Sequence, residues 1–118
     1  MNLSDYPQAI ANVQQELLKV QQRLRTAKET VAFCLSTIDR AIAFDRELKN
    51  DAQRKAKRKE LLESDSDYIE ASQSLSKLED LQVELEIELG LLRNQFSVLK
   101  LDRRESIAQI EAQVNFAA

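Results

Sequence analysis

Apolar residues recur at strictly alternating spacings of three and four along the first third of the chain. Twelve positions follow this spacing and eleven of them are apolar: Ile10, Val13, Leu17, Val20, Leu24, Ala27, Val31, Cys34, Ile38, Ala41, Asp45 and Leu48. A narrow stripe kept over so many turns is typical of a coiled-coil seam rather than of a surface helix in a globular domain. The spacing therefore predicts one long helix from about residue 5 to about residue 48. Asp5 and Gln8 are spaced as a capping pair at its start, and Pro7 fits only in its first turn.

A second stripe with the same spacing lies in the C-terminal half. It comprises Tyr68, Ala71, Leu75, Leu78, Gln82, Leu85, Leu89, Leu92, Phe96 and Leu99. The best turn signal in the chain, residues 64–67, precedes it, and Asp67 and Glu70 are spaced as a cap and its third helical residue. We therefore expect a second long helix from about 67 to about 114. Residues 49–66 form a basic connecting segment, either a short helix or a continuation of the first helix. Two seams of similar length predict an antiparallel helical hairpin in a single domain, residues 1–118.

The segment from Gln82 to Leu92 alternates polar and apolar residues with the period of a strand. We interpret it as helix, because no second strand pattern is available to pair with it and Glu and Leu favour helices. As a helix it carries a second apolar stripe, formed by Val83, Ile87, Leu91, Val98 and Leu101. One antiparallel partner covers only one stripe, so this second one predicts an oligomer interface, with a four-helix dimer or a larger assembly as the product. Gly90 would permit close approach of helices there.

The composition restricts the class of protein. One Gly, one Pro and no Trp leave little for turns or sheets, and the chain is rich in helix-forming residues. No His, no Gly-rich phosphate loop and no Cys beside a base are present, so we expect no enzyme, no cofactor and no metal site. Cys34 is expected in the core, with an interchain disulfide or a reactive thiol as alternatives. Asp45 and Gln82 are interpreted as polar breaks that fix register. With no signal peptide or membrane-spanning run, the chain is expected to be cytoplasmic with no membrane partner.

Charge is unevenly distributed. Net charge is 0 up to Leu48, +5 from Lys49 to Lys59 and −8 beyond, which together give −3. The basic segment contains Arg54, Lys55, Lys57, Arg58 and Lys59. A basic cluster at a hairpin tip binds phosphate backbones by releasing counterions, but this cluster has no aromatic residues for stacking on bases. Its alternative role is a solvated face or a contact for acidic partners, including the acidic residues of a neighbouring chain.

Two segments suggest a family. Residues 47–71, ELKNDAQRKAKRKELLESDSDYIEA, and residues 92–101, LRNQFSVLKL, resemble small coiled-coil proteins of bacterial and prophage genomes whose biochemical role is unknown. In outline, the hairpin is also similar to Gam-type phage proteins, which bind DNA ends. The resemblance implies an all-α coiled coil, and an accessory role in phage recombination or replication.

We therefore expect an all-α protein that acts as a non-enzymatic scaffold or adaptor through coiled-coil self-association and protein binding. The alternative is a nucleic-acid-binding accessory protein that uses the basic tip.

Overall fold

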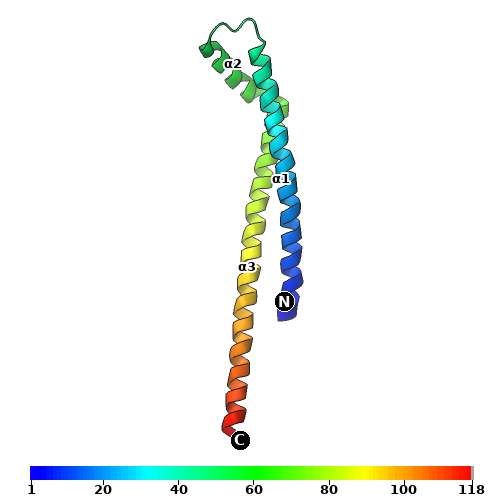
Figure 1. Ribbon diagram of the computed structural model, residues 1–118, viewed down its shortest axis with the longest axis vertical. Helices are drawn as coiled ribbons and strands as arrows, with labels where there is room; N and C mark the ends of the chain where they lie inside the picture. Colours follow the sequence, from blue (N-terminus) through cyan, green and yellow to red (C-terminus); the bar gives the residue numbers. More distant parts are fainter. Residues whose placement is uncertain (118) are drawn as a thin grey trace. The chain divides into compact units, whose positions relative to one another are not determined.

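The computed structural model describes residues 1–117, with side chains described to Phe116. A 3-10 turn, η1 (Leu3–Asp5), leads into α1 (Tyr6–Ala43), and α2 (Asp51–Ser64) and α3 (Ser66–Ala117) follow (Figure 1). No strand occurs in this range, and the alternating segment 82–92 lies within α3. The predicted all-α class is confirmed. No helix among these residues combines the length and the apolar character that crossing a membrane requires.

The residues group into two compact units, and the boundary passes through both long helices. Unit 1 comprises Met1–Leu18 and Val83–Ala118, and unit 2 comprises Lys19–Gln82. Each unit therefore contains one part of α1 and one part of α3.

In unit 1, the first turns of α1 pack on the middle of α3. Tyr6, Val13, Leu85 and Leu89 are buried there. The Tyr6 ring stands edge-on to Phe96, with ring centroids 5.7 Å apart, and the Tyr6 hydroxyl donates to Oε1 of Gln95 at 3.4 Å. Lys100 places its ammonium 4.4 Å from the centroid of the Phe96 ring. These contacts hold the start of α1 against the part of α3 between Leu85 and Lys100.

In unit 2, the remainder of α1 packs on the first turns of α3. The buried side chains are Val20, Leu24, Ile38, Ile42 and Ala71. The two helices run in opposite directions here, because residues 19–27 of α1 share a depression with residues 74–78 of α3, whereas residues 27–34 share the next one with residues 67–74. The antiparallel pairing predicted from the two seams is present within this unit.

Burial follows the predicted seams closely. All ten predicted seam residues of α3, from Tyr68 to Leu99, are buried or half-buried, including Gln82. In α1 the match holds from Ile10 to Ile38, after which Ala41 is exposed and Ile42 is buried instead. The seam therefore shifts by one residue in the last turn of α1.

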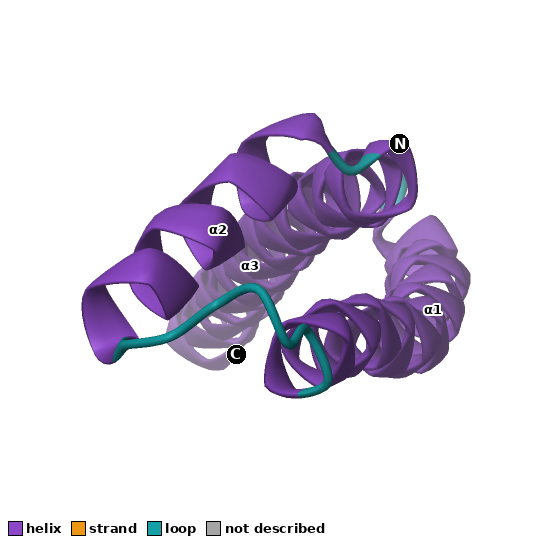
Figure 2. Cartoon of the chain, turned by 90° about the horizontal axis from the view of Figure 1, so that it is seen from above, coloured by secondary structure: helices purple, strands orange, loops and turns teal. Residues whose placement is uncertain are grey.

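The helix ends differ from the prediction, because local hydrogen bonds decide them. The first helix ends at Ala43 rather than near Leu48, and a loop joins it to α2 (Figure 2). Asp45 lies in this loop, where its Oδ1 accepts the N–H of Glu47 at 2.9 Å, so it does not interrupt a helical seam. Asn50 caps α2 by accepting the N–H of Gln53 at 2.9 Å. The connecting segment is thus a separate helix, not a continuation of the first.

The predicted capping pairs are also corrected. Asp65, rather than Asp67, precedes α3, and its Oδ1 accepts the N–H of Tyr68 at 2.8 Å. At the start of the chain, Asp5 accepts the N–H of Asn2 at 2.8 Å. Gln8 donates instead to Asn12, one turn further along α1.

Candidate interaction surface

The clearest candidate site is an apolar surface on α3 within unit 1. The predicted interface residues Val83, Ile87, Leu91, Val98 and Leu101 are each between 52% and 61% exposed. We call these five residues the exposed stripe. The structure brings all five to one side of α3, as the spacing predicted.

The exposed stripe lies almost opposite the seam that contacts α1. At about 100° per residue, the seam residues Leu85, Leu89 and Phe96 point to one side of α3, and Ile87 and Val98 point to the other. α3 therefore has two apolar faces, and α1 covers only one of them.

A shallow depression adjoins the exposed stripe. It has a volume of about 430 Å³ and is lined by Tyr6, Leu91, Asn94, Gln95, Val98 and Leu99. It joins the edge of the α1–α3 contact to the exposed stripe.

Sequence reasoning missed Asn94. The positions Ile87, Leu91, Asn94, Val98 and Leu101 keep the alternating spacing of four and three, which places this exposed amide in line with the apolar residues. The spacing alone was sufficient to find it. A polar residue at one core position of a helical interface restricts register and oligomer state, at a cost in stability.

Sequence reasoning placed the end of the α3 seam at Leu99, where burial also ends, but it missed three apolar residues beyond that point. We call residues 102–117 the tail of α3. Every described side chain of the tail, from Asp102 to Phe116, is exposed, and Ile107, Ile110 and Val114 are 46%, 59% and 62% exposed. These three keep the spacing of three and four, so the signal was present in the sequence.

The structure places the five predicted basic residues on α2, in unit 2. Three of them form ion pairs: Arg54 with Asp51 at 3.0 Å, Lys57 with Glu60 at 3.5 Å, and Arg58 with Asp39 of α1 at 2.9 Å. These are exposed pairs, so each contributes only up to ~1 kcal/mol to stability. They nevertheless place carboxylates among the cations, which reduces the positive charge offered to a phosphate backbone.

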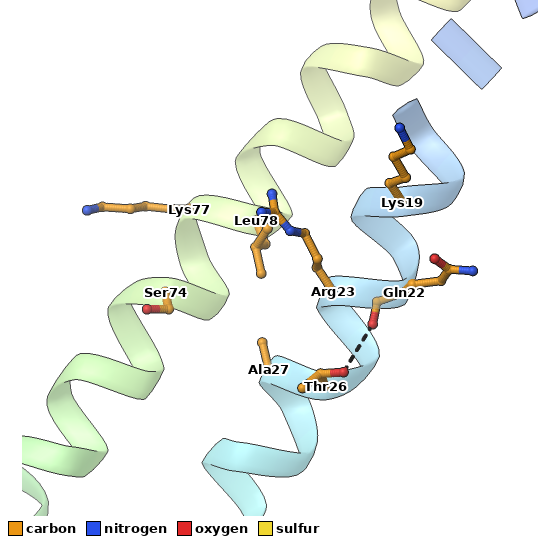
Figure 3. Close-up of a pocket in the computed structure, with 8 residues that line it drawn as sticks. All are labelled: Lys19, Gln22, Arg23, Thr26, Ala27, Ser74, Lys77 and Leu78. Carbon is orange, nitrogen blue, oxygen red and sulfur yellow. Dashed lines mark hydrogen bonds between the residues drawn. The ribbon is translucent and has the colours of Figure 1, made fainter. Parts of the chain in front are cut away.

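A further depression, which was not predicted, lies in unit 2. It measures about 880 Å³, and the residues that line it are Lys19, Gln22, Arg23, Thr26, Ala27, Ser74, Lys77 and Leu78 (Figure 3). Two of these residues, Ala27 of α1 and Ser74 of α3, have small side chains. Figure 3 shows Arg23 reaching toward α3, whereas Lys19 and Lys77 point away. The three cations do not converge, so the depression lacks the arrangement needed to hold an anion.

One other predicted residue can also be placed. Cys34 is half-buried beside Phe33, on the wall of a smaller depression of unit 2. Among residues 1–117, no three His, Cys, Asp or Glu side chains lie close enough together to hold a metal ion.

Comparison with known proteins gives no match: no family model, no curated protein and no solved structure is significantly similar to this chain. The family resemblance and the functional hypotheses from the sequence remain predictions.

Proposed function

We propose that this protein is a non-enzymatic structural or adaptor protein, and that it self-associates by packing the exposed stripe of α3 against α3 of a second copy. The observation that carries the proposal is the exposure of all five stripe residues on a helix whose opposite face packs on α1. A continuous apolar face of this kind marks a protein-binding surface. Its alternating spacing favours a helix as the bound element.

A second copy is the favoured occupant because the protein needs further burial. No side chain among the described residues is less than 2% exposed, so the core of each unit is thin. Covering the stripe with an equivalent stripe removes apolar surface from water on both chains, at about 25 cal/mol per Å². Asn94 would then lie inside the contact, where its amide requires a polar partner and so restricts the register.

The nucleic-acid alternative has less support. It depends on the five basic residues of α2, and three of them already pair with carboxylates of the same chain. We therefore keep protein binding as the proposed function and test nucleic-acid binding separately below.

The experiment compares the wild type with the stripe variant Ile87→Gln/Val98→Gln. Gln keeps helix propensity while removing apolar surface. In the wild type we expect light scattering to report at least twice the chain mass of 13.5 kDa. In the stripe variant, the Kd of the stripe contact should rise on the order of a hundredfold, since two apolar side chains per copy lose their contacts.

The matched control is Leu18→Gln/Phe33→Gln. It makes the same chemical change at two exposed apolar residues of α1, which are 54% and 72% exposed. We expect it to keep the mass of the wild type. A monomeric wild type at high micromolar concentration, or a control that dissociates as readily as the stripe variant, would contradict the proposal.

A further inference from the structure

The tail of α3 extends past the start of α1 within unit 1. Tyr6 contacts Gln95 and Phe96, and Pro7 and Ile10 share a depression with residues 93–100, but α1 leaves the tail uncovered (Figure 1). At 1.5 Å per residue, the tail is roughly 24 Å long.

The face of the tail continues the seam rather than the exposed stripe. At about 100° per residue, Ile107, Ile110 and Val114 lie on the side of α3 that carries Leu89 and Phe96. The apolar face of α3 on which α1 packs, which we call the track, thus continues beyond the first residue of α1. Any helix that fills it must lie where an extended α1 would lie.

We propose that the tail of a second copy fills this track, in an antiparallel tail-to-tail pair. This inference rests on the proposed function, because it specifies a further surface through which copies of the chain associate. The length fits. With the two-fold axis between Ala108 and Gln109, the overlap covers residues 101–116, which include all of the tail except its last residue. The second copy's tail then ends beside Lys100, close to where α1 begins.

This register also matches apolar and charged residues. Ile107 faces the partner's Ile110, and Arg103, lying over the partner's Val114, extends its guanidinium to solvent. Arg104 and Glu111 lie on the same flank of the apolar face of the tail. In an antiparallel pair, residues on this flank of one helix meet residues on the same flank of the other, so Arg104 faces the partner's Glu111. The two-fold axis repeats each contact, which gives two opposite-charge pairs. Within residues 1–117 the ion pairs of the chain itself lie elsewhere, so both side chains are available.

Charge reversal tests the pairing in the full-length chain by sedimentation velocity. Glu111→Arg places two like-charge pairs in the contact, and Arg104→Glu does the same, so each should weaken tail-mediated association about tenfold. The double variant Arg104→Glu/Glu111→Arg restores both opposite-charge pairs and should recover the association of the parent. Within one chain these residues are about 10 Å apart along the helix, so recovery cannot come from pairing inside the chain.

The parent, the two single variants and the double variant are each measured in two backgrounds, the wild type and the stripe variant. Circular dichroism checks that helix content is kept. Loss in both single variants and recovery in the double variant support the tail pair. No loss in the single variants, or no recovery in the double variant, overturns it. If the wild type associates and only the stripe variant lowers its mass, the tail pair fails while the proposed function stands. If the stripe variant associates as strongly as the wild type, the exposed stripe fails, and charge reversal in that background still decides the tail pair.

Discussion

Two aspartates, Asp65 and Asp67, lie within one turn of the point where α3 begins. Both are reasonable caps by residue type, and the spacing of Asp67 and Glu70 favoured the second in the sequence. The structure selects Asp65, whose carboxylate accepts the N–H of Tyr68. The choice depends on where α2 ends, and that end is set by the hydrogen bond from the Asp65 N–H to the Leu61 carbonyl oxygen. A pattern of single residues does not contain this information.

We predict that Asp65→Ala lowers the free energy of unfolding by about 1 kcal/mol, because the first turn of α3 loses its side-chain acceptor. Asp67→Ala is the matched control and should cost only a few tenths of a kcal/mol, through the helix dipole. Urea denaturation followed by circular dichroism, at one protein concentration, measures both. An equal or larger cost for Asp67→Ala would contradict the assignment of the cap.

Gly90 gives a second prediction at the scale of the residue. A Cβ added there meets no atom within 4 Å in the chain. In the stripe variant, where the stripe contact beside Gly90 is lost, Gly90→Ala should therefore raise the free energy of unfolding by about 0.5–1 kcal/mol. The same urea titration measures it. A loss of stability would show that another segment packs closely against this position.

At the scale of the element, the seams were the most predictable part of the fold. Three-and-four spacing depends only on helix geometry, so every predicted seam residue of α3 is at least half-buried. The end of α1 was less predictable, because neither Gly nor Pro marks it and the loop depends on the side chains of Asp45 and Asn50. The exposed stripe was predictable for the same reason as the seams. The tail was missed because Arg103 interrupts its apolar spacing.

The second helix, α2, gives the prediction for nucleic acid. We expect no complex with duplex DNA that persists at moderate salt, since counterion-driven binding weakens steeply with salt and three of the five cations are paired. A gel-shift titration in low and moderate salt measures this. The control changes Arg54, Lys55, Lys57, Arg58 and Lys59 to Gln. A complex that survives moderate salt in the wild type and is lost in the control would favour the nucleic-acid alternative.

At the scale of the whole molecule, the number of self-binding surfaces decides how large an assembly the chain forms. The exposed stripe and the apolar face of the tail lie on opposite sides of α3 in unit 1. Each of the two proposed contacts would be symmetric between two copies. A symmetric contact alone closes into a dimer. Two such contacts centred on different parts of α3 cannot both be made with the same partner, so each copy would bind two partners and the assembly would be larger than a dimer.

We therefore predict that the wild type grows beyond a dimer as its concentration rises. Blocking only the stripe, with Ile87→Gln/Val98→Gln, or only the tail, with Ile107→Gln/Ile110→Gln, should stop growth at the dimer. Combining the changes should give a monomer. Light scattering over a wide concentration range measures the mass of each protein against the 13.5 kDa chain. A wild type that stops at a dimer would mean that only one of the two surfaces binds a second copy, and the blocked variant that becomes monomeric would identify which one.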